Sequence, residues 1–211
     1  MNLLSLAIWT PIFFGVVLMA FGRDEHAGVV RWIALIGAVA GLLATVPLMA
    51  NFVVGTADMQ FVEKVSWIAR FNTHYHLGVD GLSFWFVPLT AFITVVVVIA
   101  GWEVITERVN QYMAAFLVLS GLMIGVFTAL DGLLFYVFFE AMLIPMFLII
   151  GIWGGKDRIY AAFKFFLYTF LGSVLMLVAM IARYRMSGTT DIVQLLQYDF
   201  PSETYRLLGF T

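Results

Sequence analysis

The sequence predicts an all-α fold, a polytopic transmembrane helix bundle with six spans. Hydrophobic residues make up 63% of the 211 residues and charged residues 11%, whereas soluble domains are about 45–50% apolar and about 25% charged. The charged residues also gather between long uncharged runs. These runs are long enough for the ~20 apolar residues of a membrane-spanning helix. They lack the alternation of barrel strands, so helices are the favoured interpretation.

The first three predicted spans lie in the region 1–108, within uncharged runs at 1–22, 32–57 and 81–102. The first run is also long enough for a signal peptide. It lacks a basic start and a small-residue cleavage site, so a span is favoured. Residues 58–80 are polar and include Glu63, Lys64, His74 and His76. We expect a loop outside the membrane there, with a short strand or hairpin at 60–71.

The region 109–185 holds three further spans, in the runs 109–130, 132–155 and 159–182, and 186–211 is predicted to be a polar C-terminal tail. Gly121 and Gly125 are four residues apart, and the pairs Gly37–Gly41 and Gly151–Gly155 repeat that spacing. Small residues at this spacing let two helices approach closely in lipid. The spacing therefore predicts tight helix packing or a subunit contact, although glycine is also common in membrane helices generally.

Charge and residue types set the expected topology and exclude several kinds of site. The three loops that share one side of the predicted bundle are short and basic, so we place that side in the cytoplasm and the N-terminus outside. A net charge of −2 gives no basic surface for nucleic acid. The absence of Cys excludes thiolate metal sites, and all three His lie outside the spans, which excludes a bis-histidine haem within the bundle.

Glu140 is the strongest candidate for chemistry. It lies nine residues into the uncharged run that begins at Gly132, which places it a few ångströms from the bilayer centre. A carboxylate there is costly, so it must face a partner or water. Pro145, five residues on, leaves the carbonyl of Ala141 without its helical donor. The pattern predicts a carboxyl that takes up and releases protons, or a protonated Glu that joins two helices.

Two other charges lie in or beside these helices. Lys164 is six residues into its helix, so it either tunes or relays protons near Glu140 or extends its charge to the membrane surface. Asp131 begins the Glu140 helix, where an acidic residue favours capping. His74 and His76 are too weak a pattern to predict a metal site.

Several stretches together resemble one family. They are GVDGLS at 78–83, ALD at 129–131, FEAMLIPM at 139–146, GIWG at 151–154, AAFKFFLYT at 161–169 and GS at 172–173. They are similar to the N-terminal part of the antiporter-like membrane subunits of respiratory complex I, the proton-translocating NADH:quinone oxidoreductase, in its subunit M (chain 4) branch. The likeness covers the whole chain and is most specific from 129 to 173.

The resemblance implies roles for two residues. Glu140 matches the family's fifth-helix carboxyl, which pairs with a Lys on a broken seventh helix and takes part in proton transfer. Lys164 matches a recurrent Lys of the sixth helix. The resemblance also implies no cofactor in this chain, because other subunits bind NADH, FMN, iron–sulfur clusters and the quinone (ubiquinone in mitochondria). The implied partners are neighbouring antiporter-like subunits and membrane lipid, in a bacterial plasma membrane or a mitochondrial inner membrane.

Family members contain about fourteen helices in two inverted bundles, so this chain is expected to be a truncated antiporter-like fold that lacks the seventh helix. The function implied is proton translocation coupled to electron transfer from NADH to quinone. One alternative is a subunit of a multisubunit cation/proton antiporter or a membrane-bound hydrogenase. Another is a non-transporting structural fragment that docks on partner helices.

Overall fold

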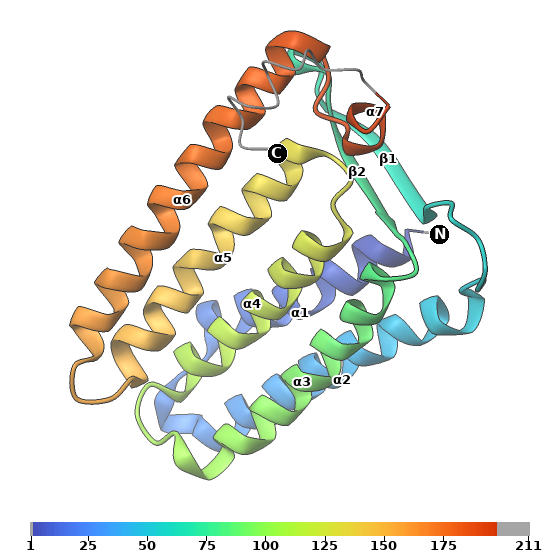
Figure 1. Ribbon diagram of the computed structural model, residues 1–211. Coiled ribbons are helices and arrows are strands. Elements are labelled where there is room, and N and C mark those ends of the chain that lie inside the picture. The colour runs from blue at the N-terminus through green and yellow to red at the C-terminus, as the bar shows by residue number, and fades with distance from the viewer. Residues whose placement is uncertain (1, 198–211) are drawn as a thin grey trace.

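The computed structural model describes residues 2–197, and six long helices dominate it (Figure 1). All six are long and apolar enough to cross a membrane, which confirms the expected bundle. The helices are α1 (Leu3–Phe21), α2 (Ala27–Asn51), α3 (Ser83–Val104), α4 (Val109–Thr128), α5 (Gly132–Trp153) and α6 (Arg158–Ser187), with a short α7 (Ile192–Leu195). Strands β1 (Gln60–Ile68) and β2 (Thr73–Val79) form one antiparallel hairpin, and 3-10 turns occupy Asp24–His26 and Ala69–Phe71.

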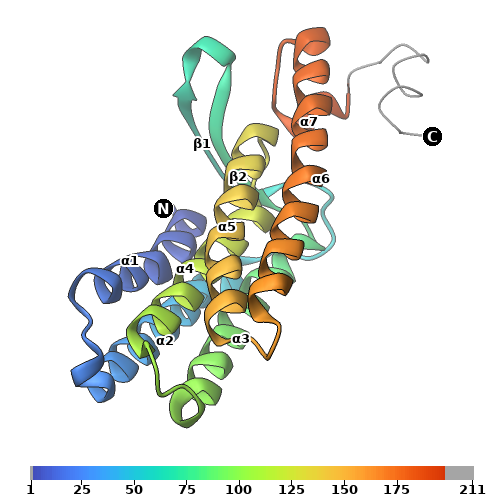
Figure 2. The same cartoon turned by 90° about the vertical axis from the view of Figure 1, so that its left-hand side faces the viewer.

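Helix α4 packs against α1, α2, α3 and α5, while α6 packs mainly on α5 at the edge of the bundle (Figures 1 and 2). One buried cluster joins α1, α4 and α5 to the hairpin, and a second joins α1, α2, α3 and α4 at the opposite end. Only Ala162 and Ser173 of α6 are buried. Helix α6 therefore presents most of its surface outward.

The hairpin extends further along the chain than the sequence predicts. The expected strand or hairpin ended at residue 71, but the chain reverses at Asn72, whose φ of 49° is left-handed, and returns as β2 to Val79. His74 and His76 therefore lie on a strand and not in a loop. The polar residues of β2 obscured it, because its buried members, such as Leu77 and Val79, depend on packing against distant elements rather than on a clear alternation.

A carboxylate of this hairpin holds the first helix. Glu63 of β1 is buried and accepts hydrogen bonds from the backbone N–H groups of Leu4 (2.8 Å) and Ser5 (3.3 Å) and from the Ser5 hydroxyl. The side chain of Asn2 at the N-cap position makes no capping bond. Because the first N–H groups of a helix lack internal partners, Glu63 supplies the cap from 58 residues away and fixes the hairpin to α1.

The predicted start of the polar tail at residue 186 lies close to the observed end of α6. Helix α6 continues to Ser187 and ends at Gly188, whose φ of 73° is the left-handed conformation typical of a residue that follows a helix. The chain then returns through Asp191, which caps α7 and is buried. The sequence did not predict that this segment is ordered and partly buried, because its residues are polar and its burial depends on contacts with the hairpin and α5. Residues 198–211 of the predicted tail lie outside the described residues.

The glycine spacing in α4 corresponds to close contacts with two different helices. A Cβ on Gly121 would lie 2.4 Å from the carbonyl oxygen of Ile8 in α1, and a Cβ on Gly125 would lie 2.7 Å from the ring of Phe138 in α5. Gly37 meets the Phe14 side chain in the same way. The absence of side chains lets α4 approach both neighbours closely.

We expect Gly121→Ala to lower the free energy of unfolding by about 1–3 kcal/mol, because the new methyl group overpacks the contact between α1 and α4. The loss is measured by unfolding the purified chain in mixed micelles with an increasing fraction of a denaturing detergent. Gly172→Ala is the matched control, since nothing lies within 4 Å of a Cβ at that α6 position. Equal losses in the two variants would show that Gly121 is not kept small by packing.

Candidate functional site

The start of α5 is held by a buried carboxylate that binds three elements. Asp131 is fully buried and occupies the N-cap position, where Oδ1 accepts from the N–H groups of Leu133 (2.9 Å) and Leu134 (3.3 Å). Its Oδ2 accepts from the Thr190 hydroxyl (2.7 Å) and the His74 N–H (3.1 Å). Asp131 therefore does more than cap, because it joins α5 to β2 and to the segment after α6.

A second buried carboxylate lies beside it. Asp191 pairs with Asp131 in a single antiparallel bridge, and its Oδ2 lies 2.8 Å from Lys64 Nζ and 3.1 Å from His76 Nδ1. Burial alone would raise the pKa of Asp191, but the hydrogen bond from Lys64 and the charge of His76 hold that pKa below its usual range. Burial lowers the pKa of His76, although Asp191 opposes the shift. The cluster fixes the end of α6 to the hairpin.

Acid is expected to loosen this cluster. The unfolded chain binds a proton on His76 near pH 6.5, whereas the folded chain binds it only at lower pH, so this contribution to stability is lost as the pH falls below that value. The contribution of Asp191 is lost below its unfolded value of 3.8. Hydrogen exchange of residues 189–195, corrected for intrinsic rates, should therefore accelerate between about pH 7.5 and pH 5. An unchanged pH dependence in His76→Asn would contradict this assignment.

Glu140 lies near the middle of α5, eight residues after Gly132 in a helix of 22 residues, or about 12 Å along an axis of about 33 Å. Its residue is half-buried, but Oε1 is buried and has no hydrogen-bond partner among residues 2–197. An unpaired buried oxygen of this kind costs about 1–3 kcal/mol or more. The structure thus places an incompletely paired carboxyl near the middle of a helix that is long and apolar enough to cross a membrane.

Two hydroxyl groups accompany this carboxyl. The phenol of Tyr136, one turn before Glu140, lies near the Glu140 carboxyl and the hydroxyl of Ser173 on α6. Ser173 is buried and donates to the Phe170 carbonyl at 2.8 Å. Glu140, Tyr136 and Ser173 therefore lie close together where α5 packs against α6. Hydroxyl groups both donate and accept hydrogen bonds, so this group is suited to share or pass a proton.

Aromatic side chains close the interface on one side of this group. The ring of Phe147 in α5 packs edge-on against the rings of Phe163 and Phe166 in α6, with ring centres 5.4 Å and 5.6 Å apart. Pro145 is buried inside α5, which stays helical through it from Gly132 to Trp153. Proline still removes the donor for the carbonyl four residues earlier, at Ala141. A spare acceptor therefore lies beside Glu140.

The structure does not bring Lys164 to Glu140. Lys164 is exposed on α6, on the face opposite the buried Ala162, and its ammonium lies 5.7 Å from the centre of the Tyr160 ring. The two charges form no ion pair within the described part of the chain. Lys164 instead lines an outward-facing cavity of about 460 Å³ with Tyr168 and other apolar residues of α6.

Sequence reasoning missed Tyr136, Ser173, Glu63 and Asp191. The spacing of Tyr136, four residues before Glu140, was an available signal, because such pairs share a helix face. Glu63 and Asp191 reach partners 58 and 127 residues away, which no local pattern reveals. Over residues 2–197, no group of three or more His, Cys, Asp or Glu is arranged to hold a metal ion.

Comparison with known proteins agrees with this architecture. Residues 129–210 match the transmembrane family model of the NADH:quinone oxidoreductase/Mrp antiporter. The chain is 55% identical to NADH-quinone oxidoreductase subunit M of Rhodobacter capsulatus, covering 99% of this chain and 41% of the relative. It is 42% identical to NADH-ubiquinone oxidoreductase chain 4 of Arabidopsis thaliana, covering 93% and 40%.

Solved structures show the same fold. A chain of respiratory complex I from Thermus thermophilus superposes with a TM-score of 0.83 at 28% identity, covering 97% of this chain and 41% of that one. The Mrp complex from Dietzia superposes with a TM-score of 0.69 at 20% identity, covering 92% of this chain and 20% of that one. At this identity the similarity is one of fold alone. The chain spans about two fifths of the length of the curated relatives it matches. By sequence and fold, the chain is similar over nearly its whole length to subunit M (chain 4) of NADH-quinone oxidoreductase and matches the N-terminal part of that subunit.

Proposed function

We propose that this chain forms part of the proton-translocating membrane arm of NADH:quinone oxidoreductase, with Glu140 as a proton-exchanging carboxyl. The observation that carries the proposal is the position of Glu140, whose Oε1 is buried and unpaired among the described residues near the centre of α5. Ionisable groups inside membrane spans are costly and mark proton relays. The similarity to subunit M and chain 4 supports the assignment to this enzyme complex.

In this role Glu140 exchanges a proton along the interface between α5 and α6. Tyr136 and Ser173 lie near the carboxyl and supply hydroxyl groups for the exchange, and the rings around Phe147 limit access of water from one side. Electron transfer elsewhere in the complex changes the free energy of protonating Glu140. Lys164, which faces away from this interface, tunes or relays protons with groups outside the described chain. NADH, FMN, iron–sulfur clusters and quinone are bound by other subunits in this proposal.

Proton-pumping measurements on the assembled complex test the role of Glu140. The variant Glu140→Gln keeps the size of the side chain but cannot exchange a proton at neutral pH.

Affinity capture of the tagged subunit from its native membrane tests which complex the chain belongs to. We expect NADH-oxidising subunits to co-purify, with NADH oxidation in the captured material. Capture of antiporter subunits alone would support the alternative of a cation/proton antiporter, which the similarity to the Mrp complex suggests. If the chain assembles into a complex whose proton movement does not depend on Glu140, the alternative of a structural fragment is supported.

A further inference from the structure

The packing of α5 on α6 places Ser173 opposite Glu140. The two helices run antiparallel (Figure 1), and a Cβ on Gly151 of α5 would lie 3.6 Å from the Cβ of Ala162 on α6. The count back from Gly151 to Glu140 and the count forward from Ala162 to Ser173 are both eleven residues. Because both helices rise by about 1.5 Å per residue, Glu140 and Ser173 lie at the same depth. The burial of Ser173, on a helix that packs mainly on α5, shows that it faces α5.

Glu140 lies at the edge of the face that α5 turns toward α6. Val137 and Ile144, on one side of it, are 42% and 63% exposed, whereas Leu143, on the other side, is 1% exposed. Successive residues of a helix are about 100° apart, so Tyr136 lies on the same side as Leu143. The Glu140 side chain can point into the interface or away from it, and Tyr136 is placed to hold it inside.

The two hydroxyl groups beside the carboxyl have different capacities. The Ser173 hydroxyl donates its single proton to the Phe170 carbonyl at 2.8 Å, so it can only accept from another group. The phenol of Tyr136 lies near both the Glu140 carboxyl and the Ser173 hydroxyl. A phenol has one proton to donate and an oxygen that accepts. Tyr136 can therefore donate to Glu140 or to Ser173, but not to both fully at once.

We propose that Tyr136 is a positioning residue, which holds the Glu140 carboxyl in the interface with α6 in both protonation states by changing its hydrogen-bond partner. An ionised Glu140 accepts from the phenol, since a hydrogen bond to a charged oxygen is the stronger choice. A protonated Glu140 donates to the phenolic oxygen, and the phenol then donates to Ser173. Every hydroxyl proton has an acceptor in either state, and the proton count changes only on Glu140. This inference rests on the proposed function, because it concerns the same carboxyl.

No charged side chain among residues 2–197 forms an ion pair with Glu140. Helix α4, which also packs on α5, contains no charged residue over Val109–Thr128. The side chain of Lys164 faces outward from α6. Asp131 lies nine residues before Glu140, or about 14 Å along the helix axis. The two hydroxyl groups therefore act on Glu140 without competition from a nearby charge in this part of the chain.

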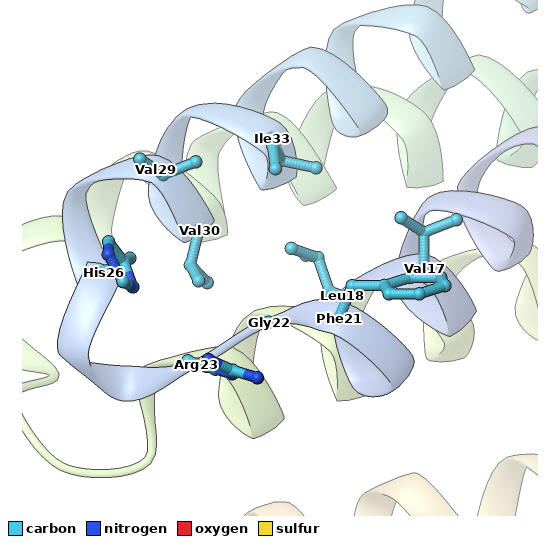
Figure 3. A pocket seen from close by; sticks show the side chains of 9 residues that line it. All are labelled: Val17, Leu18, Phe21, Gly22, Arg23, His26, Val29, Val30 and Ile33. Carbon is cyan, nitrogen blue, oxygen red and sulfur yellow. The ribbon is translucent and has the colours of Figure 1, made fainter.

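The groove between the end of α1 and the start of α2 is different in kind (Figure 3). It has a volume of about 320 Å³, and apolar side chains line it except at the turn, where Arg23 and His26 lie. Among the described residues, no carboxyl or hydroxyl side chain lines this groove. It therefore holds none of the groups on which the arrangement around Glu140 depends.

Infrared spectroscopy of the purified chain in lipid nanodiscs tests the proposal without requiring transport. Difference spectra between acidic and alkaline pH contain the C=O stretch of each carboxyl that gains a proton, and the band absent from Glu140→Gln belongs to Glu140. We expect this band to move to higher frequency in Tyr136→Phe, because the carboxyl loses a hydrogen bond, and to move less in Ser173→Ala. Tyr184→Phe is the matched control, since it removes a phenol from α6 whose ring packs against Phe71 instead.

Two spectroscopic results would overturn the proposal. The first is a Glu140 band that stays at the wild-type frequency in Tyr136→Phe, or that moves equally in Tyr184→Phe. The second is the absence of any band that Glu140→Gln removes, because the change of partner requires both protonation states. Circular dichroism confirms that each variant is folded, and the loss of one hydroxyl keeps the ring of Tyr136 in place.

Proton translocation by the assembled complex gives a second measurement. We expect Tyr136→Phe to reduce it by about ten-fold, the factor that corresponds to one hydrogen bond to a charged group, and Ser173→Ala by about three-fold, the factor for a neutral hydrogen bond. Ser173→Thr keeps the hydroxyl and should retain more activity than Ser173→Ala. A shifted band in Tyr136→Phe with normal pumping by Glu140→Gln would refute the proposed function alone. An unshifted band with pumping lost in Glu140→Gln would refute the positioning role alone.

Discussion

The variant Glu140→Gln in the complete subunit is expected to reduce proton translocation by about 100-fold or more, the range that a positioned proton-transfer group contributes. Glutamine keeps the contact with Tyr136 on the same helix but cannot release a proton. NADH oxidation coupled to pumping should fall in parallel. Acridine-dye quenching in proteoliposomes measures the proton movement, and absorbance of NADH measures turnover.

The control for this experiment is Glu103→Gln, which neutralises an exposed carboxyl at the end of α3. This variant should pump at the wild-type rate, whereas Glu140→Asp should retain part of the activity because the carboxyl is present but displaced. Wild-type pumping by Glu140→Gln in a fully assembled complex would refute the proton-exchange role. Loss of assembly is detected separately by native gel electrophoresis, and pumping is then normalised to assembled enzyme.

The second large effect is expected at Asp131. Replacement by Ala removes two capping hydrogen bonds of α5 and leaves the Thr190 hydroxyl and the His74 N–H without their shared acceptor. A lost cap costs about 0.5–2 kcal/mol, and each group left unpaired costs about 1–3 kcal/mol when fully buried, with the lower part of that range applying to the half-buried His74 and Thr190. We therefore expect a loss of about 3–5 kcal/mol in the free energy of unfolding. Thermal unfolding in detergent, followed by circular dichroism, measures it.

Asp157 provides a matched control, because it occupies the N-cap position of α6 but its side chain makes no capping hydrogen bond. Asp157→Ala should change the stability by less than about 0.5 kcal/mol, as exposed surface substitutions do. Hydrogen exchange in Asp131→Ala should also accelerate in both β2 and residues 189–195, since Asp131 joins these segments. A loss confined to α5 would show that Asp131 acts as a cap alone.

The candidate site was only partly predictable from the sequence. The burial of the Glu140 carboxyl follows from one charge within a long apolar run, because hydrocarbon surrounds any residue at that depth. Which way the side chain points does not follow, since every face of α5 is apolar and no stripe defines its rotation. The same reason explains Lys164. Its depth was predictable, but its outward orientation on α6 depends on which face packs against α5.

The sequence by itself determined the six spans, because burying about 20 apolar residues in lipid is a local requirement that each run meets alone. It also determined the break at Asp131 and the position of the membrane carboxyl. Only the tertiary structure decided the return strand, the cap that Glu63 supplies to α1, and the pairing of Asp191 with Lys64. The last two contacts join residues 58 or more and 127 positions apart, and their geometry depends on how whole helices pack rather than on any repeat in the chain.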